Sequence, residues 1–335
     1  TLMAFGFDKQ AKLFHMLSSS LYSNKLGSVL RELSSNGRDA RVEAGRPDEP
    51  FYIIGPTYEN PELVVKDNGV GLTKERAKKT ILMYLGSSKD QSADFIGGWG
   101  IGSKSPFAYA KNYTVICVKD GMLVEFACWK DEKGMPRDAV IREEKTAAPN
   151  GVEMRMPVDA SDIRKCNNTI REYMEWTNYT VVATINGENV ARREASEYVK
   201  TDAYTIKLYE EGEGSVRLVY GGASYKVEDC IDERYELLER WEALKEAIDK
   251  NVDVAIVVDT PGAVDFNMNR EELEQTERSQ SFVNTLVSYM LEVADAQRLT
   301  YEDSIDQIRA NGKESNLASV EQAIAAALTR KNNVD

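Results

Sequence analysis

Histidine is almost absent from this 335-residue chain, which has one, His15. This disfavours Ser–His–Asp catalysis and the zinc and iron sites that need paired histidines. The four cysteines, Cys117, Cys128, Cys166 and Cys230, lack the CxxC spacing of a metal or redox pair, so we expect reduced, buried thiols. Any catalysis must therefore use carboxylates, amides, backbone donors and a bound metal ion.

Long apolar runs and an excess of positive charge are also lacking. No stretch approaches the ~18 to 20 apolar residues of a membrane span, and Leu2–Phe7 lacks the flanks of a signal peptide. The 42 Lys and Arg against 55 Asp and Glu give a formal net charge of −13. This balance disfavours a general, charge-driven binder of nucleic acid. We expect a cytoplasmic protein with no transmembrane segment.

The hydrophobic pattern predicts an α+β fold with about two domains. In the first, residues 1–160, we expect helices on one face of a mixed sheet. A second α/β domain is expected over 161–297, and a helical segment over 298–335. The main expected elements are the helix Lys25–Ala44, short strands Phe51–Ile54 and Leu63–Lys66, four antiparallel strands between 113 and 157, and later strands that include Val181–Ile185 and Val252–Val258.

The first motif is Glu32-Leu-Ser-Ser-Asn36-Gly-Arg-Asp39. At 100° per residue, Glu32, Asn36 and Asp39 fall within roughly 60° of one another on one helix face. Two acids and an amide in this arrangement can hold a divalent cation and a water. Taken alone, the motif also fits a solvated polar stripe.

The second motif, Asp67-Asn-Gly69-Val-Gly71, follows an expected strand. A carboxylate at a strand end can accept a hydrogen bond from an amino group, and the glycines allow backbone to approach a ligand. Taken alone, it is equally a glycine turn after an edge strand.

The third motif is the cluster Gly97-Gly-Trp-Gly100-Ile-Gly102-Ser-Lys104. Glycines before a helix expose backbone N–H groups that can cradle phosphate. A Walker A loop is disfavoured because Ser103, not lysine, follows Gly102. The dinucleotide fingerprint is disfavoured by the glycine spacing and the distance from the N-terminus.

Together, and in this order, the three motifs resemble the ATP site of the GHKL (Bergerat-fold) superfamily. That superfamily includes gyrase B-type topoisomerases, ninety-kilodalton heat-shock chaperones, histidine kinases and MutL-type repair proteins. The resemblance covers about residues 25–160, and the segment Phe95–Phe107 is most similar to phage proteins of the rIIA type. A histidine kinase is disfavoured because His15 sits in no phosphoacceptor-like context.

The resemblance implies a role for each matching residue. Glu32 is similar to the general base, Asn36 to the Mg²⁺ ligand, Asp39 to a residue that orients them, and Asp67 to the acceptor of the adenine amino group. Residues that would approach the nucleotide are Gly69, Gly71, Lys89, Gly97, Gly100, Gly102 and Lys104. Residues 73–96 would form a lid that closes over ATP.

One position departs from the family pattern. Relatives carry Gly-Thr near the last strand of the sheet, where the threonine hydroxyl supports the adenine-binding aspartate. This chain reads Asn150-Gly-Val152. The resemblance therefore implies that a water or Asn150 replaces the hydroxyl.

The segment after Val252–Val258 contains Asn269-Arg270-Glu-Glu-Leu273. It resembles the catalytic loop in the middle domain of the heat-shock chaperones, where an arginine reaches the γ-phosphate. This implies a transducer-like domain of the ribosomal-S5 type with Arg270 as a catalytic residue. An ordinary charged helix start remains the alternative.

These expectations describe a Mg²⁺-dependent ATPase of low turnover whose lid closure drives homodimerisation of a clamp. The rIIA likeness suggests the infected bacterial cytoplasm, with a phage or host protein as partner and possible peripheral contact with the membrane. Two alternatives stay open: an ATP-gated interaction protein with negligible turnover, and a DNA-handling clamp. The absence of an initiator methionine suggests a fragment of a longer protein.

Overall fold

The computed structural model describes residues 23–79, 105–132, 134–231, 236–247, 250–258, 260, 262–267 and 271–291. The chain divides into two compact units, one running to Arg192 and including Gly221–Ala223, and the other holding the remainder from Arg193 onward. The expected helical segment 298–335 and lid residues 80–96 lie outside the described residues.

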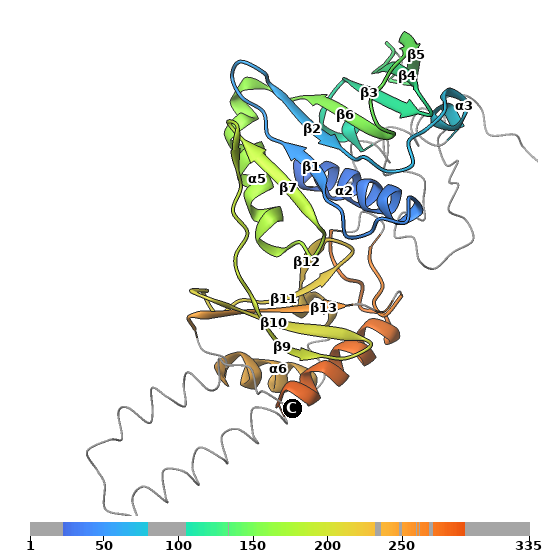
Figure 1. Ribbon diagram of the computed structural model, residues 1–335. Coiled ribbons are helices and arrows are strands. Elements are labelled where there is room, and N and C mark those ends of the chain that lie inside the picture. The colour runs from blue at the N-terminus through green and yellow to red at the C-terminus, as the bar shows by residue number, and fades with distance from the viewer. Residues whose placement is uncertain are drawn as a thin grey trace, which may run out of the picture. The chain divides into compact units, whose positions relative to one another are not determined.

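The first unit is built on an eight-stranded mixed sheet of order β5-β4-β3-β6-β2-β1-β7-β8 (Figure 1). Its strands are β1 (Phe51–Ile54), β2 (Glu62–Lys66), β3 (Asn112–Lys119), β4 (Met122–Lys130), β5 (Pro136–Lys145), β6 (Gly151–Pro157), β7 (Val181–Ile185) and β8 (Glu188–Asn189). The β1–β7 pair is parallel and the other neighbours are antiparallel. The expected strands between 113 and 157 are confirmed as an antiparallel group.

One face of this sheet forms the core because alternate residues of neighbouring strands are in register. Ile53 pairs with Val65 and with Ala183, and Val65 pairs with Met154. All four are buried. Strand side chains alternate between faces, so this register gathers the apolar set on one side.

Helices cover that core. They are α2 (Lys25–Glu43), the short α3 (Lys74–Ala77) and α4 (Pro106–Tyr109), and α5 (Ile163–Trp176). A 3-10 turn, η4 (Ala160–Asp162), leads into α5 and has no buried residue. The helix α2 contacts β1, β2, α4 and α5. It starts where the Oδ1 of Asn24 accepts a hydrogen bond from the Gly27 N–H at 3.1 Å, an N-cap interaction.

The first unit extends past the boundary expected near residue 160. The reason is the non-local pairing of β7 with β1, which makes Val181–Ile185 part of the first sheet. The helix α5, which precedes β7, contacts α2 of the same unit. A connection between two parallel strands needs such a crossover, and here it places α5 on the sheet.

The second unit has a five-stranded sheet of order β12-β11-β13-β10-β9 (Figure 1). Its elements are β9 (Ser196–Lys200), β10 (Tyr204–Glu210), β11 (Val216–Tyr220), β12 (Ala223–Lys226), η5 (Val227–Cys230), α6 (Glu236–Ala247) and β13 (Val252–Val258), and residues 277–291 are helical. The strand β13 is buried along its whole length, as expected for a central strand. Arg240 of α6 donates to the Ser288 hydroxyl at 2.9 Å, which ties the two helices together.

All four cysteines are free and buried, as the sequence predicted. Burial raises the pKa of Cys117, Cys128 and Cys166 to about 12, so these thiols stay protonated. Among the helices that the structure describes, none is both long and apolar enough to cross a membrane.

Candidate functional site

The first-motif residues lie on successive turns of α2. Glu32 and Asp39 are 7% and 2% exposed, and Asn36 is half-buried. The Asp39 carboxylate accepts a hydrogen bond from Arg38 at 3.4 Å. A solvated polar stripe would leave both acids exposed, so their burial favours the functional interpretation.

Asp67 follows β2 and is a buried acid, with 7% of the residue exposed. Its Oδ1 accepts a hydrogen bond from the Gly69 N–H at 2.7 Å. Burial raises the pKa of the carboxyl to about 6, although the backbone of Gly69 and Val152 and the charge of Arg41 act in the opposite direction. Because little water reaches this carboxylate, few solvent hydrogen bonds compete with a ligand group that donates to it.

Packing within the protein explains why the second motif needs glycines. A Cβ at Gly69 would lie 2.6 Å from the Cβ and carbonyl oxygen of Ala40, so the loop presses directly onto α2. Gly71 has a φ of 68°, and a Cβ there would lie 1.9 Å from the Val118 carbonyl oxygen. These contacts seat the Asp67 loop against the residue that follows Asp39, which brings the first two motifs together.

At the position that departs from the expected pattern, backbone groups support Asp67. The Asn150 side chain is bound to Asp120, accepting from its N–H at 2.8 Å and donating to its carboxylate at 3.3 Å. It does not replace the missing hydroxyl. The backbone of Val152 instead accepts from the Asp67 N–H at 2.9 Å and also supports the Asp67 carboxylate.

Several predicted site residues lie outside the described residues. They are Lys89, Gly97, Gly100, Gly102, Lys104 and Arg270. Their roles stay predictions.

Residues 262–267 and 271–291, on the two sides of Arg270, are described, and some of them bond to one another. The Asn267 side chain accepts from the Glu271 and Glu272 N–H groups at 3.1 and 3.3 Å. Phe266 and Leu273 form an isolated antiparallel bridge. These contacts join residues 266–267 to residues 271–273.

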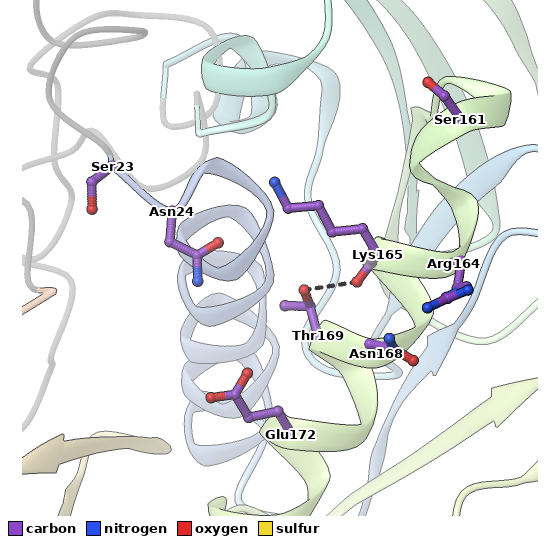
Figure 2. Close-up of a pocket in the computed structure, with 8 residues that line it drawn as sticks. All are labelled: Ser23, Asn24, Ser161, Arg164, Lys165, Asn168, Thr169 and Glu172. Atoms are coloured by element: carbon purple, nitrogen blue, oxygen red, sulfur yellow. Dashed lines mark hydrogen bonds between the residues drawn. The ribbon is translucent and has the colours of Figure 1, made fainter.

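A pocket of about 710 Å³ lies elsewhere, between the start of α2 and the exposed side of α5 (Figure 2). Figure 2 shows Lys165 and Glu172 from α5, and Asn24 at the N-cap of α2, at its walls. None of the predicted site residues that the structure describes lines it. We therefore assign the pocket no part in the candidate site.

The sequence motifs do not include Arg41, which is 1% exposed and whose charge lowers the pKa of Asp67. The sequence does contain a sign that Arg41 is buried. Arg41 follows Leu30, Leu33 and Gly37 at the three- and four-residue spacing of a buried helix face, so the pattern places a cation at a core position.

No protein-family model matches the chain, but individual known proteins are similar to it. The chaperone protein HtpG of Geobacter metallireducens is 26% identical over 254 residues, which are 67% of this chain and 38% of that protein. HtpG of Escherichia coli O1:K1 / APEC is 34% identical over 133 residues, which are 33% of this chain and 21% of that protein. The crystal structure of the ATPase region of Saccharomyces cerevisiae topoisomerase II bound to ICRF-187 has a TM-score of 0.52 at 12% identity and covers 80% of this chain and 86% of that one.

The topoisomerase II structure confirms the predicted α+β fold. The similarity to HtpG supports the predicted resemblance to the GHKL superfamily. The chain spans 38% of the length of the Geobacter relative. The likeness to rIIA-type proteins is not tested by them and stays a prediction.

Proposed function

Because this chain shares its fold with the ATPases of the GHKL superfamily, we propose that it binds ATP with Mg²⁺ and hydrolyses it slowly. The observation that carries the proposal is the placement of Asp67. Its buried carboxylate sits in a loop pressed onto α2, and α2 also carries Glu32 and Asn36.

Each candidate residue has a chemical role in this proposal. Asp67 accepts from the adenine amino group, and Glu32 takes a proton from the attacking water, with Asp39 orienting the groups beside it. The amide oxygen of half-buried Asn36 is a hard ligand that suits Mg²⁺, and the ion, when bound, neutralises phosphate charge. The glycines Gly97, Gly100 and Gly102 and the lysines Lys89 and Lys104 complete the phosphate contacts.

The output of the cycle is conformational. Residues 73–96 close over ATP, Arg270 reaches the γ-phosphate from the transducer-like second unit, and two copies of the chain dimerise as a clamp. We assign this clamp to the rIIA type, acting in the cytoplasm of an infected bacterium on a phage or host protein.

Nucleotide selectivity tests the recognition half of the proposal. Calorimetric titration of the chain with ATP, ADP and GTP in Mg²⁺ should show binding of the adenine nucleotides only. Asp67→Asn should weaken ADP binding, while Asp138→Asn, which changes an exposed acid of β5, should not. Equal binding of GTP and ATP, or unchanged affinity in Asp67→Asn, overturns the assignment of the pocket.

Turnover tests the catalytic half. A general base contributes ~10²–10⁴ in rate, so Glu32→Ala should keep ATP affinity and lose nearly all hydrolysis. Glu172→Ala, an exposed acid on α5, is the matched control. ATP binding without measurable turnover in the unmodified chain would favour the ATP-gated interaction protein, and a salt-dependent affinity for DNA would favour the DNA clamp.

A further inference from the structure

Arg41 is a buried cation whose hydrogen bonds are incomplete. Its Nη2 donates to the Pro50 carbonyl at 2.6 Å, and its Nε donates to the Glu49 carbonyl at 3.4 Å. The same Nη2 lies 3.0 Å from the Glu49 carboxylate, which is itself about half exposed. The Nη1 atom is buried with no hydrogen-bond partner among the described residues. A guanidinium is expensive to bury, so a core position for it requires compensating negative charge.

The loop that carries Asp67 is fastened beside this arginine. Arg46 donates to the Asn68 carbonyl at 2.5 Å and pairs with the Glu49 carboxylate at 3.0 Å. On the other side, Gly69 is pressed against Ala40, the residue before Arg41. The end of α2, the segment after it and the Asp67 loop therefore form one connected structure.

Charge links Arg41 to Asp67 within this structure. Burial raises the pKa of the Asp67 carboxyl to about 6, and the backbone of Gly69 and Val152 and the charge of Arg41 keep it from rising further. A second titratable group that interacts with Asp67 is Cys117 of β3, whose pKa of about 12 leaves it neutral in any ordinary buffer.

We propose that Arg41 is a positioning residue of the nucleotide site, whose buried guanidinium, packed beside the Asp67 loop, adds to the backbone N–H groups that keep the Asp67 carboxylate able to accept from an adenine amino group. The inference rests on the proposed function, because it assumes that Asp67 contacts adenine. Arg41 itself touches no nucleotide. It acts through Asp67, and Glu49 moderates it by sharing its charge.

The test is the pH dependence of ADP affinity between pH 5 and 9, measured by calorimetry on the whole chain. For the unmodified protein, affinity should fall as the pH drops through about 6, where Asp67 takes up a proton. Arg41→Met should move the midpoint upward, by about one pH unit for each tenfold loss of charge stabilisation. A shift of one unit, from about 6 to about 7, would roughly halve the affinity at pH 7, and the affinity should recover at pH 9.

Glu49→Gln should move the midpoint downward, since removing this carboxylate leaves the full charge of Arg41 acting on Asp67. It is also the variant expected to fold without difficulty, because Glu49 is about half exposed. Arg171→Gln removes an exposed charge from α5 and should leave the midpoint unchanged.

Opposite shifts in Arg41→Met and Glu49→Gln support the inference, and a merely structural arginine would weaken binding equally at every pH. If Arg41→Met does not fold, the Glu49→Gln shift decides together with Arg46→Gln, which removes the other cation paired with Glu49 and should leave the midpoint unchanged. Unshifted midpoints, with Asp67→Asn still defective in ADP binding, overturn the role of Arg41 and leave the proposed function standing. Full ADP binding by Asp67→Asn overturns the proposed function itself.

Discussion

Arg192 and Arg193 are consecutive in the chain, yet each binds to a different unit. Arg192 donates to the backbone carbonyls of Tyr179, at 3.1 Å, and Thr177, both in the first unit. Arg193 pairs at 2.6 Å with Asp253 of the second unit. The peptide between the two arginines is thus the point at which the chain leaves the first unit, with a fixed anchor on either side.

Removing the second anchor should loosen the second unit alone. Asp253 is 4% exposed and also accepts from the Glu213 and Ser215 N–H groups at 2.9 and 2.8 Å. Asp253→Ala leaves these donors and Arg193 without an acceptor and should cost about 3 kcal/mol. Hydrogen exchange followed by mass spectrometry should show faster exchange in 196–220 and 252–258. Arg192→Ala is the control and should affect residues 177–185 instead, and uniform effects of both variants would contradict the two-anchor interpretation.

The Asp67 loop should be intolerant of any side chain at Gly71. Alanine there combines a positive φ with a Cβ 1.9 Å from the Val118 carbonyl, so Gly71→Ala should lose several kcal/mol of stability, of order 3 or more. Gly45 has a similar φ of 70°, but a Cβ at this position would meet nothing within 4 Å. Gly45→Ala should therefore cost only about 1 kcal/mol. Urea unfolding of both variants measures the difference, and equal costs would show that the loop can move away from β3.

The buried Asp67 should make stability depend on pH in an unusual direction. Its folded pKa of about 6 lies above the value of about 3.9 expected in an unfolded chain, so between these values the folded state holds the extra proton. Stability of the unmodified protein should then fall as pH rises from about 4 to 6, by about 3 kcal/mol in all. Asp67→Asn lacks this contribution. The difference in unfolding free energy, variant minus unmodified, should grow by that amount from pH 4 to 7, and a flat difference would mean that Asp67 is not buried in solution.

Arg270 should couple the second unit to hydrolysis. An arginine that senses the γ-phosphate can be worth ~10³–10⁵ in nucleotide hydrolases, so Arg270→Ala should cut turnover strongly while ADP affinity stays unchanged. Arg270→Lys should rescue only in part, because an ammonium lacks the planar fork of guanidinium. The control is Arg278→Ala, since Arg278 is exposed and pairs with Asp265 of the same segment. Normal turnover in Arg270→Ala would return this residue to an ordinary surface charge.

The sequence predicted those parts of the fold that depend on local pattern. The helix Lys25–Ala44 and the strand Phe51–Ile54 match α2 and β1 almost residue for residue, since apolar spacing and the breakers Gly45 and Pro47 determine them. It misplaced the boundary between units because Val181–Ile185 reads as a strand without showing its partner. A parallel pair formed across more than a hundred residues leaves no trace in local periodicity.

For the site, sequence pattern supplied the residue types but not their surroundings. The motif predicted that Asp67 would matter, yet its burial depends on α2, β3 and β6 packing around one loop. Arg41 was overlooked because an arginine near a helix end is usually exposed, and its spacing with the core residues was the only local sign that this one is not.

The support of Asp67 by the main chain of Val152 has an evolutionary consequence. A hydroxyl that holds the aspartate ties a position to threonine or serine, whereas a peptide group does the same work under any side chain that suits a strand. Residue 152 packs against the core, so a change there that keeps an apolar strand side chain leaves this support of Asp67 in place. A sequence search that demands the hydroxyl would pass over chains in which the backbone supports the aspartate instead.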